Sequence, residues 1–337
     1  MHEQQISAYR VKQAWLIGAQ SYLVDRIVPD VERISLPAKD VPGGVLRFGR
    51  GAFPPPKARG RLERLRKGAQ RSRPVPGPNT LDLRRNTPQN WAHFLNNHLP
   101  ITFAIAAGMD LALSDLDLVL PEQTPGYIRA AADLFGLRYV QTDDALDGTG
   151  LLFDAEPWIG IRPCRMEWTQ TAAVRQALAH LDAPASPDTP LPSKAFLSRK
   201  DARIPSNEAE IADWLGTQGF VTLYPEDLSA ADQLRLFRQA ETIVAVHGAG
   251  LAPLLYAPAQ DRPRHLVEIL PCGHMTDVYR VMAQQMGWNW IGVRGRMKPE
   301  YVRGAYDFSA PFTTHSLDTF EIDLTALQEA FRLAALS

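Results

Sequence analysis

A histidine and two glycines come directly after an apolar run, Thr242–Val246. The order His247-Gly248-Ala249-Gly250 predicts a strand that ends in a tight turn and opens a helix. Glycines there let the backbone approach a ligand, and the free N–H groups at a helix start attract a phosphate. The spacing fits neither G-x-G-x-x-G nor G-x-x-x-x-G-K-[ST], which argues against that dinucleotide fold and against an ATPase. His247 can donate to a phosphate or a sugar hydroxyl; the alternative is a turn that simply needs small residues.

A second polar group, Ser198-Arg199-Lys200, follows a short apolar run at 195–197. Two cations and a hydroxyl at the end of a strand can neutralise a diphosphate, and the arginine fork matches two phosphate oxygens. Glu268 interrupts a third apolar run, where it can accept from ribose hydroxyls or pair with a buried donor. Because parallel strands end at one edge of a sheet, we expect all these residues at one site that binds a phosphate-bearing ligand. The alternative for Arg199 and Lys200 is an exposed loop.

Three polar residues of the first half, Asn90, His93 and Asn97, have the spacing of one helical face. Such a face can bind a sugar acceptor, and His93 can remove a hydroxyl proton, although a helical histidine is more often structural. Asp115 and Asp117 form a D-x-D tripeptide that holds a metal in some sugar transferases. The tripeptide is common before strands, and we expect no metal and no cofactor.

The elements that must position these residues are clearest in the second half. Strands alternate there with helices, which predicts right-handed crossovers and a parallel, doubly wound, Rossmann-like sheet. The predicted strands are 195–197, 220–223, 242–246, 266–270 and 288–293. Helices are predicted to begin at Asn207, Ser229, about Gly250 and Thr276, and a final amphipathic helix covers 324–336.

The first half predicts a second α/β domain. Its strands are expected at 44–48, 116–120 and 138–140, and its helices at 125–135 and 90–108, the latter broken at Pro100. We predict an N-terminal domain 1–183 with a basic, proline-rich insertion near 50–80, a stiff proline-rich linker 184–192, and a C-terminal domain 193–337. The last helix is expected to pack back on the first domain.

Composition excludes several classes. The chain has 337 residues, a net charge of −1 and two cysteines, so a disulfide framework is not expected. Neither a signal peptide nor a membrane span is recognisable, which predicts a cytoplasmic protein. Residues 1–85 nevertheless carry 17 basic and 7 acidic side chains. The stretch 57–73 predicts contact with phosphate groups such as those of an anionic membrane, or else a solvated loop; it lacks aromatic residues for stacking on nucleic acid bases.

The motifs resemble glycosyltransferase family 61. The resemblance covers about residues 85–293, and 90–100 looks like the family segment N-[YF]-x-H-W-x-x-[DE]-x-L-P. The other matching residues are Ser198-Arg199-Lys200, Arg203, Asn207-Glu208, Gly219-Phe220, Glu226, Gln233, Ala240, His247-Gly248-Ala249-Gly250-Leu251 and Glu268. The resemblance implies a GT-B architecture of two facing Rossmann-like domains, with the donor on the C-terminal one and the acceptor on the N-terminal one. It also implies metal-independent transfer with inversion at the anomeric carbon.

Two positions depart from the family pattern. Asn97 stands where the family often has an acidic residue, and Pro253 stands where an asparagine is usual. Since an amide cannot act as a base, His93 becomes the candidate base and Arg199 the residue that stabilises the leaving diphosphate. The hypothesis is a transferase that moves a sugar from a UDP-sugar to a glycan or lipid-linked hydroxyl in cell-surface polysaccharide synthesis. The alternatives are a nucleotide-sugar epimerase on the same scaffold and a non-catalytic nucleotide or sugar binder.

Overall fold

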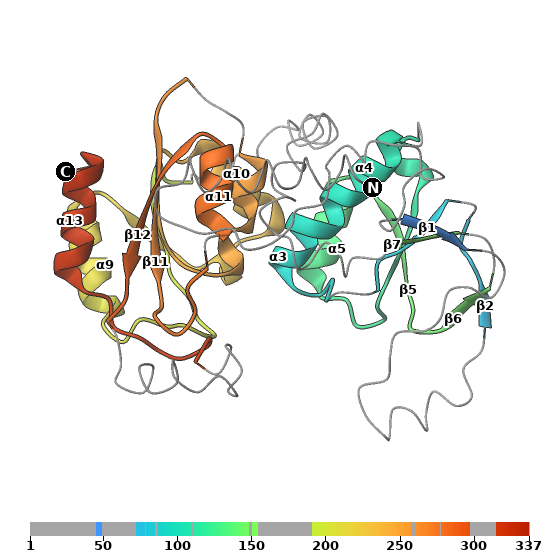
Figure 1. The fold of residues 1–337 in the computed structure, drawn as a ribbon, viewed down its shortest axis with the longest axis horizontal. Coiled ribbons are helices and arrows are strands. Elements are labelled where there is room, and N and C mark those ends of the chain that lie inside the picture. Colours follow the sequence, from blue (N-terminus) through green and yellow to red (C-terminus); the bar gives the residue numbers. More distant parts are fainter. Residues whose placement is uncertain are drawn as a thin grey trace, which may run out of the picture. The chain divides into compact units, whose positions relative to one another are not determined.

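The computed structural model describes residues 45–48, 72–77, 79–84, 87–108, 111–147, 150–153, 191–257, 261–276, 278–296 and 315–336 (Figure 1). The chain divides into two compact units, Met1–Ala183 and Pro184–Ser337. Nearly all of the predicted linker and of the basic stretch 57–73 lies outside the described residues. Arg73, at the end of that stretch, forms an ion pair of 2.5 Å with Asp144.

The second unit is built on a five-stranded parallel sheet, as its sequence pattern predicts. In chain order the strands are β8 (Lys194–Leu197), β9 (Val221–Leu223), β10 (Thr242–Val246), β11 (Arg264–Leu270) and β12 (Trp288–Arg294). In space their order is β12-β11-β10-β8-β9. The chain therefore winds outward in one direction from β8 to β9 and in the other from β10 to β12. The order reverses between β8 and β10, which lie side by side.

Helices cover both faces of this sheet (Figure 1). One face carries α9 (Glu208–Thr217) and α13 (Leu324–Ala334); the other carries α10 (Ala230–Gln239), α11 (Val278–Gln285) and the 3₁₀ segment η7 (Ala249–Tyr256). Every residue of β10 is buried, because an inner parallel strand is covered on both sides. Ser229 caps α10 as predicted, its side chain accepting from the N–H of Asp232.

The buried face of the C-terminal helix packs in the core of the second unit. Phe331 contacts Trp214 and Phe220, with ring centroids 4.9 and 5.5 Å apart. The helix is thereby an integral part of the sheet's covering layer, together with α9.

The first unit contains a smaller mixed sheet. Its order is β1-β7-β3-β4-β5, in which only β1 runs antiparallel. The strands are β1 (Val45–Phe48), β3 (Thr80–Asp82), β4 (Asp117–Leu120), β5 (Arg138–Gln141) and β7 (Gly150–Phe153); β2 (Ser72–Pro74) pairs separately with β6 (Ala145–Asp147). Helix α5 (Gly126–Leu134) and the 3₁₀ turn η4 (Leu113–Asp115) complete the described elements outside the helical stretch that follows.

The predicted break at Pro100 is replaced by a widened turn just before it. Helix α3 (Trp91–His93) runs into a π-helical segment η3 (Phe94–His98) and then into α4 (Leu99–Gly108). The N–H of Leu99 donates to the carbonyl of Phe94, five residues back. Pro100 sits in the first turn of α4, where its missing N–H costs little, so the helix widens instead of ending. None of the helices in the described ranges combines the length and apolarity that a membrane crossing requires.

Candidate functional site

The predicted donor-site residues meet where the strand order of the second unit reverses. Ser198 and Arg199 follow β8, and His247 and Gly248 follow β10, its paired neighbour. A Cβ added at Gly248 would overlap Nη1 of Arg199, so the guanidinium lies directly against this glycine. Open α/β sheets bind ligands at such a reversal, outside the carboxyl ends of the strands. The structure thus brings together two segments that lie about fifty residues apart in the sequence.

Arg199 is largely buried but loosely paired. Its side chain is 13% exposed; Nη2 donates to Asp201 at 2.8 Å, and Nε lies 3.9 Å from a Glu226 oxygen. That Nε is buried and has no hydrogen-bond partner among the described residues. Burial tends to raise the pKa of Asp201, but the hydrogen bond and charge of Arg199 outweigh it and hold that pKa below its usual value. Arg199 therefore has donor capacity that Asp201 does not use.

Lys200 pairs with a different carboxylate from those that Arg199 contacts. Its Nζ contacts both carboxylate oxygens of Asp227, at 2.7 and 2.6 Å, and lies 4.9 Å from the ring centre of Tyr224. The side chain is 49% exposed. Contact between Lys200 and a phosphate would exchange Asp227 for the ligand. Of the two predicted cations, Arg199 is the one already placed at the sheet reversal.

The turn after β10 needs its glycines because neighbours approach them closely. Gly248 has an extended backbone, with φ 164°, so its conformation alone does not demand glycine. A Cβ at Gly250 would lie 2.7 Å from Cγ of Pro225. Ala249 begins η7, separated from the end of β10 by two residues, and the start of η7 has no side-chain cap. The first N–H groups of a helix lack partners within the helix and can therefore bind an anion.

Glu268 lies at the centre of a polar row across three strands. It pairs in register with Ala245 on β10 and with Gly292 on β12. His247 contacts one carboxylate oxygen through Nδ1 at 2.5 Å, and Trp290 donates from Nε1 to the other at 2.7 Å. Glu268 is 0% exposed and His247 is 4% exposed. The carboxylate thus contacts buried donors, which is one of the two alternatives that the sequence left open for Glu268; contact with a ribose stays a prediction.

Arg203 is a site residue that local sequence pattern did not single out. Its backbone is left-handed, with φ 58°, a conformation that costs non-glycine residues about 1–3 kcal/mol. The guanidinium donates to the carbonyls of Ser316 at 2.6 Å and His247 at 3.2 Å. Burial, followed by the charge of Arg199, lowers the pKa of Arg203. Its presence among the family-typical residues was the one sequence signal, because its partners come from distant segments.

Two aromatic rings surround His247. The ring centres of His274 and Tyr279 lie 5.3 and 5.4 Å from that of His247. The loop that carries His274 follows β11, again at the carboxyl edge, and α11 supplies Tyr279. Ser198, at the end of β8, is fully buried, and its Oγ lacks a hydrogen-bond partner within the described part of the chain.

The predicted acceptor residues belong to the first unit, where their local roles are visible. Asn90 caps α3 by accepting from the N–H of His93 at 3.1 Å. The Nδ1 atom of His93 lies 2.5 Å from Oγ1 of Thr87, which orients the ring. Asn97 is half-buried within the π-helical segment. Asn90 thus acts at the helix start, and His93 remains the side chain of this face with acid–base capacity.

The two aspartates of the D-x-D tripeptide are engaged within the first unit. Asp115 accepts from the N–H of Ala112 at 3.2 Å, and Asp117 pairs with Arg138 at 3.0 Å. No group of three or more His, Cys, Asp or Glu side chains suited to a metal occurs in the ranges that the structure describes.

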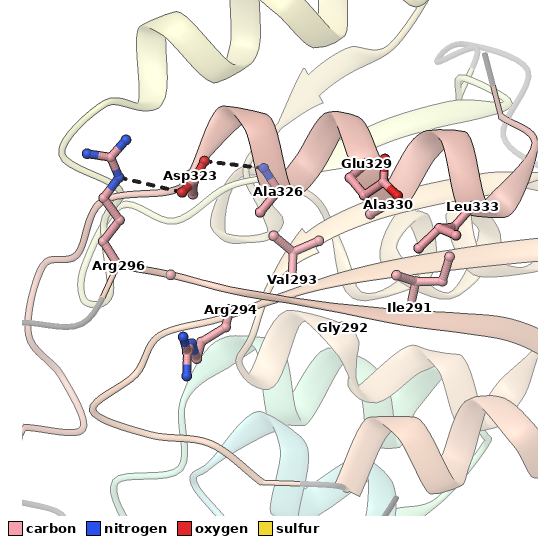
Figure 2. A pocket seen from close by; sticks show the side chains of 11 residues that line it. Ile291, Gly292, Val293, Arg294, Arg296, Asp323, Ala326, Glu329, Ala330 and Leu333 are labelled. Atoms are coloured by element: carbon pink, nitrogen blue, oxygen red, sulfur yellow. Dashed lines mark hydrogen bonds and ion pairs between the residues drawn. The ribbon is translucent and has the colours of Figure 1, made fainter. Parts of the chain in front are cut away.

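A groove of about 580 Å³ lies elsewhere in the second unit, between β12 and α13 (Figure 2). Val293, Ala330 and Leu333 line its apolar part, and Asp323 and Arg296 lie at one end, 3.9 Å apart. Val293 belongs to the core on the α9–α13 face. Gly292, which pairs with Glu268, is the neighbour of Val293 on β12, and neighbouring positions of a strand face opposite sides of the sheet. The groove and the contact between Glu268 and His247 are therefore on opposite faces of the sheet.

The second unit is thus a parallel α/β unit with two partly buried arginines and a glycine turn at its strand reversal, the place where open α/β sheets bind ligands. Comparison with protein families then identifies the protein: the family described as Glycosyltransferase 61 matches residues 91–262, about half of the chain. The chain belongs to this family and is a glycosyltransferase. A comparison with curated proteins found no significant match. The matched region spans His93, Arg199 and the turn after β10, and ends before Glu268.

Proposed function

We propose that the protein transfers a sugar from a nucleoside-diphosphate sugar, specifically a UDP-sugar, to a hydroxyl group with inversion and without a metal. The observation that carries the proposal is Arg199, a nearly buried guanidinium held against Gly248 at the strand reversal. A planar fork in a partly dry site matches the oxygens of a diphosphate. Arg203 adds a second cation nearby.

In this proposal the acceptor oxygen attacks the anomeric carbon, while the bond from that carbon to the diphosphate oxygen breaks on the opposite face. The acceptor proton passes to His93, and the nucleoside diphosphate leaves with the electron pair. Because negative charge grows on the leaving group, preorganised donors there lower the barrier most. Arg199, the N–H groups from Gly248 to Gly250 and, after release from Asp227, Lys200 supply them.

The wider proposal is a GT-B enzyme whose two α/β units hold the acceptor and the donor respectively. Asn90, His93 and Asn97 would face the acceptor, a glycan or lipid-linked sugar of cell-surface polysaccharide synthesis. We place the enzyme in the cytoplasm, with the basic stretch 57–73 reaching an anionic membrane surface. Membership of the transferase family favours this function over the epimerase and the non-catalytic binder.

The first experiment is thermal unfolding with UDP, GDP, ADP, dTDP, CMP and NAD. A ligand at about 100 times its Kd adds about 2.7 kcal/mol to the free energy of unfolding, an easily measured shift. We expect UDP to stabilise the protein and UMP to do so much less, because a single phosphate leaves donors of Arg199 unused. Arg199→Gln should lose the UDP response. The matched variant Arg332→Gln, on the exposed face of α13 and paired with Glu329, should keep it.

Each outcome decides one part of the proposal. Equal responses to UDP and UMP would remove the diphosphate role of Arg199. A response to CMP alone would change the donor class, and a response to NAD alone would contradict the donor assignment. If UDP binds, release of UDP from a UDP-sugar only when acceptor is present separates transfer from epimerisation, and the anomeric configuration of the product tests inversion.

A further inference from the structure

We infer that Glu268 is a positioning residue for His247, which it holds with Nδ1 toward the sheet and Nε2 toward the ligand. The inference rests on the proposed donor site but concerns the side chain behind it. The reaction as proposed needs no contact between Glu268 and the donor. The geometry gives the carboxylate another task.

The strand register explains how the contact arises. Ala245 on β10 pairs with Glu268, so His247, two residues further, projects from the same face as Ala245 and reaches the carboxylate diagonally. On the other side Gly292 pairs with Glu268, and a Cβ there would lie 2.5 Å from the indole of Trp290. Gly292 therefore makes the space through which Trp290 reaches the second oxygen.

The hydrogen-bond chemistry fixes which ring nitrogen is held. An indole N–H can only donate, so the Glu268 oxygen that contacts Trp290 is an acceptor. We assign the hydrogen of the 2.5 Å contact to Nδ1 of His247, which then donates to the other oxygen of Glu268. Nε2 is then the ring nitrogen left to meet a phosphate or sugar oxygen.

A purely structural role explains the arrangement poorly. A carboxylate with no exposed surface is costly to bury, and a buried charge network is often no more stable than apolar residues of the same size. The neighbouring inner strand β10 is buried along its whole length with mainly apolar residues. What the carboxylate adds that an apolar residue could not is a fixed orientation of the adjacent imidazole.

The test combines nitrogen NMR with binding of UDP. The full chain is labelled with ¹⁵N-histidine, and the His247 signals are assigned among the eight histidines by their loss in His247→Gln. In the wild type we expect the neutral ring to be protonated at Nδ1. Glu268→Gln, which turns an acceptor pair into one acceptor and one donor, should shift the ring toward the Nε2-protonated form and weaken UDP binding about tenfold.

Two further variants separate a positioning role of Glu268 from a purely structural one. In His247→Gln, adding Glu268→Gln should cause no additional loss of UDP affinity, because Glu268 acts through the imidazole. Trp290→Phe, which removes the other hydrogen bond of the same carboxylate, should keep the Nδ1-protonated ring and change UDP affinity by less than threefold.

The results that would overturn the positioning role of Glu268 differ from the result that would overturn the donor site. A wild-type ring protonated at Nε2 overturns the inference even if every variant fails to fold. An additive loss in the double variant, or an equal loss in Trp290→Phe, would also overturn it. If the wild type binds no UDP while its ring is Nδ1-protonated, the donor assignment fails and the positioning of His247 stands.

Discussion

Two arginines at the carboxyl ends of inner strands, one in each unit, are held in opposite ways. In the first unit Arg84 forms two parallel hydrogen bonds with Asp82, at 2.9 and 2.8 Å, and both side chains are 1% exposed. Its remaining nitrogen donates to the carbonyls of Thr142 and Asp144. Arg199 in the second unit has one hydrogen bond to an exposed carboxylate and one distant ion pair.

The difference separates an arginine whose donors are all used within the protein from one that keeps donors for a ligand, as the proposed donor site requires. The Arg84 fork is filled by one carboxylate and two carbonyls, so a ligand would find nothing to contact. Arg199 is almost as well shielded, but its strongest partner, Asp201, is 65% exposed and can be exchanged. The carboxyl end of an inner strand is thus a place where a ligand site can occur in an α/β fold. Whether the arginine at that place is available to a ligand depends on how fully its donors are already paired.

The largest expected effect is on the buried ion pair between Asp82 and Arg84. Asp82→Asn leaves a buried guanidinium without its counter-charge and should lower the free energy of unfolding of the first unit by about 3–5 kcal/mol. Hydrogen exchange of peptides spanning β3 to β5 measures this without assuming that both units unfold together. Asp82→Leu combined with Arg84→Met should recover most of the loss. A loss below about 1 kcal/mol in Asp82→Asn would remove the contrast between the two arginines.

Arg199→Gln should show the reverse pattern. We expect a loss of about 2–4 kcal/mol in transition-state stabilisation, from kcat/KM, because charge on the leaving diphosphate is no longer met. The free energy of unfolding should change by less than about 1 kcal/mol, since the partners of Arg199 are solvent-exposed. Normal turnover with a large loss of stability would make Arg199 a second structural arginine.

His93→Ala tests the corresponding assignment in the first unit. A lost general base lowers turnover by about 10²-fold or more. Because His93 belongs to the other unit, the affinity for UDP should stay within about twofold of the wild type, a difference of less than 0.5 kcal/mol. UDP release in the presence of acceptor and calorimetric binding of UDP measure the two quantities. Lost UDP binding together with normal unfolding would transfer His93 to the donor site.

The sequence predicted the second unit well and the first less well, for a physical reason. Strand β10 is covered on both faces, so the almost wholly apolar run Thr242–Val246 marks it directly. Strands β2 and β6 have three residues each and pair only with one another, 73 residues apart, so no local period reveals them. The π-helical turn before Pro100 was likewise invisible to a 3.6-residue pattern.

The candidate site likewise contains parts that the sequence predicted and parts that it did not. The glycine turn and the group Ser198–Lys200 are local patterns at strand ends, and fold class alone was enough to predict that they converge. The pairing of Glu268 with His247 and Trp290 requires the register of three strands, which the sequence does not state. Arg203 depends on Ser316, 113 residues away.

Gly248→Ala tests how firmly Arg199 is held against the turn after β10. The new methyl group would overlap Nη1 of Arg199, and moving the guanidinium should weaken UDP binding by about 1 kcal/mol, the net value of one hydrogen bond. The extended φ of 164° accommodates alanine, so stability should hardly change. Gly216→Ala in α9, with no atom within 4 Å of the new Cβ, is the matched control and should only add helix propensity. Unfolding caused by Gly248→Ala would show that Arg199 cannot move.

The smallest expected effect concerns Asp201, the exposed partner of Arg199. The folded-state pKa of Asp201 is lowered, so its ion pair contributes stability above the unfolded pKa and loses it as pH falls through the folded one. Asp201→Asn should therefore cost less than about 1 kcal/mol at pH 7, a difference that begins to shrink near pH 4 and disappears once the pH is below the folded-state pKa. If the carboxylate occupies the place of a phosphate oxygen, the same variant should bind UDP about twofold more tightly (about 0.4 kcal/mol), because the ligand no longer competes with it. Weaker UDP binding would instead mean that Asp201 orients Arg199, and that the open arginine is held by its partner much as Arg84 is.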